Sequence, residues 1–123
     1  KQLEQLPVLN KKIQEDKNFI ILPPVSFLEM ICLEKNAGLL ITDSGGVQKE
    51  AFFFKKPCII LRSETEWVEL VDCGASRLAD ADETKIIATA DYYLHDKKLS
   101  FPALFGNGKT AEFICKEILN NIK

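Results

Sequence analysis

The sequence lacks most of the side chains from which metal sites and catalytic triads are built. It contains a single histidine, His95, and its four cysteines include no C-x-x-C pair. Zinc sites need clustered cysteine and histidine, and Ser-His-Asp or Cys-His triads need an imidazole. His95 lies at the end of a predicted helix beside Asp96, where a solvated residue is expected. The sequence therefore predicts no metal, no cofactor and no triad.

Long apolar runs and an excess of positive charge are also absent. The longest apolar runs, 19–25 and 58–61, are far too short to cross a bilayer. Sixteen Lys and Arg against eighteen Asp and Glu give a net charge of −2, which argues against nucleic-acid or membrane partners. Cys58 and Cys115 lie inside apolar stretches and are expected to be small buried residues. Unpaired cysteines fit a reducing, cytoplasmic compartment.

What the sequence does contain is a regular alternation of short apolar segments and helices. Apolar character predicts strands at 19–22, 39–42, 58–61 and 76–78, and the first three, being continuous, should be covered on both faces of a sheet. Caps, periodicity and stop signals predict helices at 26–38, 47–54, 66–73, 82–94 and 110–121. This order predicts a doubly wound, parallel α/β sheet in a single domain spanning residues 1–123. A first strand with its phosphate turn is missing, so we expect the later part of a nucleotide-binding domain.

The segment TDSGG follows the predicted strand 39–42 and leads at once into a helix. In doubly wound sheets, ligands bind beyond the carboxyl ends of the strands, and a helix N-terminus favours phosphate. Gly45 and Gly46 would let a phosphate approach the main chain, and Ser44 offers a hydroxyl. Glu50, one turn into the helix, could accept hydrogen bonds from a ribose diol. The alternative is a tight turn capped by Asp43 or Ser44, because short glycine motifs are weak signals.

A second glycine motif, Gly106 to Thr110, is similar to the end of a P-loop. The loop would need a glycine at position 103, where the sequence has Ala103. The preceding segment contains Pro102 and does not have the pattern of a buried strand. A glycine turn that opens the last helix is therefore favoured over a nucleoside-triphosphatase site.

A third candidate, RSETEWVE, follows the strand at 58–61 and so lies on the same rim as TDSGG. Its polar and aromatic side chains could contact a nucleotide or sugar: Arg62, Thr65, Glu66 and Trp67. Spacing alone equally allows a solvated loop with Trp67 packed on the next helix.

Taken together, TDSGGVQKEAFFFKKPCIILRSETEWVELVDCGASRLA resembles the non-hydrolysing UDP-N-acetylglucosamine 2-epimerase family, and the similarity extends over about residues 19–121. The resemblance implies a GT-B fold, in which two Rossmann-like domains hold UDP in the cleft between them. This chain would be a truncated C-terminal, UDP-binding domain whose partner is the missing N-terminal domain. The resemblance also implies a homodimer that acts on UDP-N-acetylamino sugars in cell-surface polysaccharide biosynthesis.

The resemblance assigns roles to particular positions. Ser44, Gly45 and Gly46 match the residues that hold the diphosphate, and Glu50 matches the glutamate that binds the ribose hydroxyls. The segment 24–30 matches the loop that contacts uracil, mainly through Val25 and Met30. The family commonly has Arg-Pro after Thr-Glu, whereas this chain has Trp67-Val68. TEWVE is similar to a subgroup that acts on modified UDP-sugars such as UDP-2,3-diacetamido-2,3-dideoxyglucuronate.

The implied reaction inverts C2 by elimination of UDP to a glycal and re-addition to the opposite face. The acid and base groups belong to the N-terminal domain, so this chain should contain no catalytic residue and be inactive alone. A UDP-dependent glycosyltransferase domain and a non-catalytic nucleotide-sugar-binding module are the alternatives. Because a partner domain is missing, we expect exposed apolar surface and self-association.

Overall fold

The computed structural model describes residues 6–95 and 99–122. The chain divides into two compact units, residues 1–30 and 31–123. The first unit contains helix α1 (Pro7–Glu15), an irregular segment and the start of helix α2 (Phe27–Asn36). The second contains the sheet and the other helices. The TDSGG turn and the loop after the strand at 58–60 lie in the second unit.

Helix α2 begins with the capping box that the sequence predicts. The Ser26 N–H donates to Glu29 Oε2 at 2.7 Å, and the Glu29 N–H donates to Ser26 Oγ at 3.4 Å. Hydrogen bonds from Ser26 hold the pKa of Glu29 below its usual value. The helix ends at Asn36, two residues before Gly38. The predicted helix at 26–38 is confirmed, with its boundaries shifted by one or two residues.

The predicted strand at 19–22 is wrong. The segment has no regular structure, and Phe19 and Ile20 are 55% and 78% exposed. A strand exists only when a neighbouring strand satisfies its backbone groups, and apolar composition supplies no such partner. Within the described residues, the sheet contains only the three later strands.

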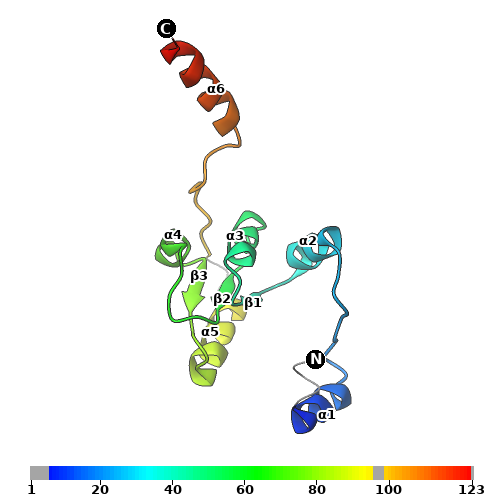
Figure 1. Ribbon diagram of the computed structural model, residues 1–123. Helices are drawn as coiled ribbons and strands as arrows, with labels where there is room; N and C mark the ends of the chain where they lie inside the picture. The colour runs from blue at the N-terminus through cyan, green and yellow to red at the C-terminus, as the bar shows by residue number, and fades with distance from the viewer. Residues whose placement is uncertain (1–5, 96–98, 123) are drawn as a thin grey trace. The chain divides into compact units, whose positions relative to one another are not determined.

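The other predicted strands form one parallel sheet in the order β1-β2-β3 (Figure 1). The strands are β1 (Leu40–Thr42), β2 (Cys58–Ile60) and β3 (Ser76–Leu78). Ile59 lies opposite Ile41 on one side and Arg77 on the other. All of β2 is buried, as its apolar run predicts. The same expectation is wrong for β1, an edge strand in this sheet, where the side chain of Ile41 is 49% exposed and so is not covered on its face.

Helices cover both faces of the sheet: α3 (Gly45–Phe53) and α4 (Val68–Asp72) on one, and α5 (Glu83–His95) on the other. Alternation along β2 explains this arrangement. Cys58 and Ile60 pack with Ala51 of α3, whereas Ile59 packs with Tyr93 of α5. The doubly wound α/β class is therefore confirmed. Burial raises the pKa of the Cys58 thiol to about 12, as expected of an inert core residue.

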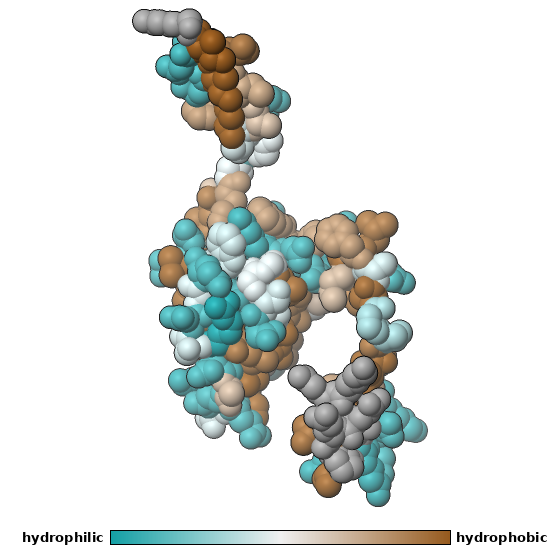
Figure 2. All heavy atoms as spheres, viewed as in Figure 1, coloured by the Kyte–Doolittle hydropathy of each residue, from teal (hydrophilic) through white to brown (hydrophobic). Residues whose placement is uncertain are grey.

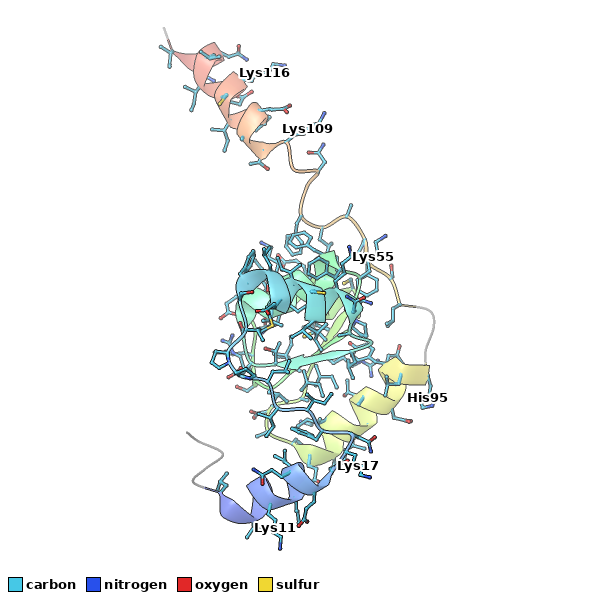
Figure 3. The ribbon with its side chains drawn as sticks, turned by 90° about the vertical axis from the view of Figure 1, so that its right-hand side faces the viewer. Lys11, Lys17, Lys55, His95, Lys109 and Lys116 are labelled. Carbon is cyan, nitrogen blue, oxygen red and sulfur yellow. The ribbon has the colours of Figure 1, made fainter. Side chains whose placement is uncertain are left out.

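The ends of α4 and α5 match their sequence signals. Gly74 follows α4 with a φ of +79°, a left-handed conformation that favours glycine. Asp82 caps α5, with its Oδ1 accepting from the Lys85 N–H at 3.0 Å. His95 ends α5 as an exposed residue, with Nδ1 2.8 Å from the Asp91 carbonyl oxygen (Figure 3). Its predicted neighbour, Asp96, lies outside the described residues.

Helix α6 (Thr110–Asn121) has the predicted bounds and follows a glycine turn. Gly106 and Gly108 have φ values of +63° and +79°, which supports the turn over the P-loop interpretation. No residue of α6 is buried, and its apolar side chains lie on the surface (Figure 2). The prediction that Cys115 is buried is therefore wrong, because α6 has an apolar face that nothing in the described chain covers. No described helix is long and apolar enough to span a membrane.

Candidate functional site

The paired glycines after β1 lie inside the first turn of α3. The glycines with left-handed φ values are Gly74, Gly106 and Gly108, so neither Gly45 nor Gly46 is needed for an unusual backbone conformation. Glycine in a helix costs about 0.5–1 kcal/mol relative to alanine. An unusual backbone conformation is therefore not the reason for this costly pair, and close approach of a ligand to the backbone stays a prediction.

The N-terminus of α3 has no side-chain cap at Ser44. Ser44 is the N-cap residue with extended backbone angles, yet its side chain makes no capping hydrogen bond. Its N–H donates to Thr42 Oγ1 at 3.0 Å, and its carbonyl accepts from the Gln48 N–H at 3.2 Å. The interpretation of Ser44 as a side-chain cap is therefore not supported. The N–H groups of the first turn donate no hydrogen bond to the Ser44 side chain. They lie at the carboxyl edge of the sheet, together with the positive end of the helix dipole.

The two glycines face different surroundings. A Cβ built on Gly45 would lie 3.4 Å from Glu66 Oε2 and 3.6 Å from Trp67 Nε1. A Cβ built on Gly46 would meet only Ser44 Oγ, at 3.8 Å. The side of Gly45 is covered by the loop after β2, whereas the space above Gly46 is open. A ligand can therefore approach the backbone most closely at Gly46.

The loop after β2 is tied to α3 by side-chain hydrogen bonds. Trp67 Nε1 donates to the Gly45 carbonyl at 2.9 Å, and Thr65 Oγ1 donates to Gln48 Oε1 at 2.6 Å. The Trp67 N–H donates to Thr65 Oγ1 at 3.2 Å. Trp67 is half-buried and packs with Leu70 of α4, as the alternative of a loop with a packed tryptophan predicts, and Thr65 is half-buried as well. Sequence reasoning missed Gln48, a fully buried polar residue whose only signal is its place in an apolar helix.

Arg62 and Glu66 form a bidentate ion pair in the loop after β2, at the carboxyl edge of the sheet. Arg62 Nη1 lies 3.0 Å from Glu66 Oε2, and Nη2 lies 2.9 Å from Oε1. Hydrogen bonding to Glu66 raises the pKa of Arg62, and hydrogen bonding to Arg62 lowers the pKa of Glu66. The pair is solvent-accessible and contributes little to stability. Its effect is to hold the Glu66 carboxylate on the Gly45 side of the turn.

We expect Trp67→Phe to destabilise the second unit by about 0.5–1.5 kcal/mol, because it removes the donor to the Gly45 carbonyl. The ring contacts should survive in the variant. The ring of Phe105 packs edge-on against that of Trp67, with 6.0 Å between the ring centroids, and Lys49 Nζ lies 4.1 Å from the Trp67 ring centroid. Urea unfolding measures the difference. A urea unfolding curve with the same midpoint and slope as the wild type would show that this hydrogen bond does not hold the loop.

Glu50 is half-buried on α3, and its carboxyl interacts with that of Glu34 on α2. Glu34 is 2% exposed. Both of its carboxylate oxygens are buried, and neither accepts a hydrogen bond from the described residues. Burial raises the pKa of Glu34, and the charge of Glu50 acts in the same direction. The burial of Glu34 was not predicted from the sequence, since glutamate in a helix is ordinarily a surface residue.

The residues predicted to contact uracil lie in the first unit. Val25 is half-buried and Met30 is 42% exposed. Ser44, Gly46 and Glu50 belong to the second unit, so the structure describes the two parts of the predicted site separately. No group of three or more His, Cys, Asp or Glu able to hold a metal occurs in residues 6–95 and 99–122.

A parallel sheet covered on both faces, with an uncapped glycine turn at its carboxyl edge, is the architecture of the doubly wound class of α/β domain. The sequence matches the UDP-N-acetylglucosamine 2-epimerase family over residues 4–119, and the chain belongs to this family. Its solved relatives have the GT-B type of fold.

Individual relatives agree with this assignment. The chain is 47% identical over 100 residues to UDP-2,3-diacetamido-2,3-dideoxy-D-glucuronate 2-epimerase of Pseudomonas aeruginosa, covering 78% of this chain and 28% of that protein. It is 45% identical over 105 residues to UDP-N-acetylglucosamine 2-epimerase of Methanocaldococcus jannaschii, covering 85% and 28%. The structure of a Methanocaldococcus jannaschii UDP-GlcNAc 2-epimerase in complex with UDP-GlcNAc and UDP superposes with a TM-score of 0.80 at 41% identity, covering 95% and 32%. The chain thus spans less than a third of the length of each relative.

Proposed function

We propose that this chain is the C-terminal, UDP-binding part of a longer UDP-sugar 2-epimerase that works as a cytoplasmic homodimer. The observation that carries the proposal is the uncapped start of α3, with open space above Gly46. Helix N-termini of this kind bind diphosphates through N–H groups and the helix dipole. Membership of the epimerase family, and the UDP bound in the Methanocaldococcus jannaschii structure, support UDP as the ligand.

The proposed contacts divide the nucleotide among separate groups. The Ser44 hydroxyl and the N–H groups of Gly45 and Gly46 bind the diphosphate. The Glu50 carboxylate accepts hydrogen bonds from the ribose diol, and the segment around Val25 and Met30 contacts uracil. Four further residues of the rim are weaker candidates for contacts with the sugar: Arg62, Thr65, Glu66 and Trp67.

In this proposal the chain stabilises the leaving group. Elimination removes the C2 proton and breaks the bond between C1 and the diphosphate oxygen, giving a glycal and UDP. Re-addition of UDP, with the proton delivered to the opposite face, inverts C2. Negative charge grows on the diphosphate as the C1–O bond breaks, and preorganised N–H donors stabilise it. The groups that move the proton would come from the N-terminal domain, so the chain alone is expected to be inactive.

The proposed substrate is a UDP-2-acetamido sugar. The sequence TEW after β2, and 47% identity to the Pseudomonas aeruginosa enzyme, favour a modified sugar such as UDP-2,3-diacetamido-2,3-dideoxyglucuronate. The product would supply cell-surface polysaccharide biosynthesis.

The test is to incubate the full-length gene product with UDP-GlcNAc and with the diacetamido sugar in deuterated water. We expect inversion at C2 and incorporation of deuterium at that carbon. Proton NMR detects both changes. The 123-residue chain, as the matched control, should produce neither. Transfer of the sugar to an added acceptor without inversion would instead indicate a glycosyltransferase. UDP binding with no change at C2 would indicate a non-catalytic binding module.

A further inference from the structure

The indole N–H of Trp67 is used inside the protein, at the turn that the proposed function assigns to the diphosphate. Its Nε1 donates to the Gly45 carbonyl at 2.9 Å. An indole has one donor and no acceptor, so the Trp67 side chain has no polar group left for a ligand. Any polar effect of this side chain on a bound nucleotide therefore passes through Gly45.

The hydrogen bond to the Gly45 carbonyl also fixes the Gly46 N–H. These two groups belong to one planar peptide unit, and in a trans peptide they point in opposite directions. The described residues contain no cis peptide bond. Gly46 is the second residue of α3, so its N–H is one of the donors at a helix start that have no partner within the helix. The indole thus holds one end of a peptide whose other end faces the start of the helix.

This peptide needs a restraint because glycine stands on both sides of it. Glycine has more backbone freedom than any other residue, so Gly45 and Gly46 resist rotation of the peptide between them very little. Rotation would turn the Gly46 N–H away from the start of the helix. A carbonyl oxygen has two lone pairs, so the Gly45 carbonyl can accept from the helix and from the indole together. The indole therefore adds a restraint that the helix alone does not supply.

The indole is itself held in place by α3 and by its own loop. The Trp67 N–H donates to Thr65 Oγ1 at 3.2 Å, and Thr65 Oγ1 donates to Gln48 Oε1 at 2.6 Å. Gln48 is fully buried on α3, so this chain of hydrogen bonds ends in the core. Lys49 Nζ lies 4.1 Å from the centroid of the Trp67 ring. The Nε1 donor is therefore oriented before any ligand arrives.

We propose that Trp67 is a positioning residue that orients the Gly46 N–H towards the diphosphate of the nucleotide, through the peptide that joins Gly45 to Gly46. The inference rests on the proposed function, in which that N–H binds the diphosphate. A donor oriented in advance loses less entropy when the ligand binds. A hydrogen bond to the carbonyl also polarises the peptide and strengthens its N–H as a donor. Both effects act on the diphosphate and neither acts on uracil or ribose.

The experiment replaces Trp67 of the full-length protein by 3-benzothienylalanine, an isostere in which sulfur takes the place of the indole N–H. The variant keeps the two fused rings and loses only the donor to Gly45. Calorimetric titration measures the affinity for UDP, and competition with UDP measures the affinity for uridine, which has no phosphate. We expect the affinity for UDP to fall about three- to tenfold. The affinity for uridine should be unchanged.

Phe105→Leu is the matched control for the ring contacts of Trp67. The ring of Phe105 packs edge-on against that of Trp67, with 6.0 Å between the ring centroids. The control removes this ring contact and keeps the indole donor. Its affinity for UDP should equal that of the wild type, and a loss as large as that of the isostere would show that packing, not the hydrogen bond, is responsible.

A double-variant cycle tests whether Trp67 acts through Gly46. The added Cβ of Gly46→Ala hinders the approach of the diphosphate to the same N–H. In the Gly46→Ala background the isostere at position 67 should have little further effect on the affinity for UDP, because both changes act on one hydrogen bond. A loss by the same factor in both backgrounds would show that Trp67 acts elsewhere, and would overturn the inference.

Failure of the inference and failure of the proposed function give different results. A wild type that does not bind UDP would overturn both. The inference alone fails if Gly46→Ala weakens UDP binding while the isostere at position 67 binds UDP as the wild type does. It also fails if the isostere weakens UDP and uridine by the same factor, because a purely structural role has that result.

Discussion

Gly46→Ala is expected to stabilise the protein and, at the same time, to lower its affinity for UDP about ten- to hundredfold. Gly46 lies in the first turn of α3, and an added Cβ would meet only Ser44 Oγ, at 3.8 Å. The fold therefore accepts alanine, which in a helix gains up to about 0.5–1 kcal/mol over glycine. The same Cβ occupies the space through which the diphosphate approaches. Each charge-assisted hydrogen bond lost there removes about 1.5–3 kcal/mol of binding free energy.

Gly38→Ala is the matched control for this prediction. Gly38 lies outside the turn, has no left-handed φ, and a Cβ built on it meets nothing within 4 Å. Its alanine variant should leave UDP affinity unchanged. Urea unfolding and calorimetric titration measure the two effects separately. Unchanged UDP affinity in Gly46→Ala would show that the glycines are not there for a phosphate.

Ile59→Ala is expected to destabilise the second unit by about 2–5 kcal/mol. Ile59 is fully buried in the central strand and packs between Ala79 and Tyr93, so a truncated side chain leaves a cavity. Domains of this size have total stabilities of about 5–15 kcal/mol, so the variant should be partly unfolded under mild heating. Thermal or urea unfolding followed by circular dichroism measures the loss.

The control for this substitution is Ile87→Ala on α5. Ile87 is 61% exposed, so its truncation should change stability by less than about 0.5 kcal/mol. Equal effects of the two substitutions would contradict the assignment of β2 as the central buried strand.

Local patterns in the sequence were sufficient to predict the three strands of the sheet, and most helix boundaries to within about two residues. The apolar run at 58–61 became the buried central strand, and the Ser26–Glu29 box became a cap with the expected hydrogen bonds. Gly74 and Asp82 mark helix ends through their own backbone and side-chain geometry. These features depend on neighbours along the chain, which a single sequence displays.

The errors concern interactions between distant segments. The segment 19–22 has the composition of a strand, but strand formation depends on a pairing partner that composition does not reveal. Cys115 lies on an apolar helix face, and its burial would need a covering surface. Gln48 and Glu34 were missed because both polar side chains are buried only in the folded chain, and Gln48 accepts its hydrogen bond from Thr65, a residue distant in sequence. The roles of Ser44, Gly45, Gly46 and Glu50 in binding UDP stay predictions.

The most direct test of the central claim is a calorimetric titration of the full-length protein with UDP, beside the double variant Ser44→Ala, Gly46→Val. We expect saturable binding by the wild type and no measurable binding by the double variant, with α3 still folded by circular dichroism. Equal affinity of the two proteins for UDP would contradict it, and the TDSGG segment would then be only a turn between β1 and α3.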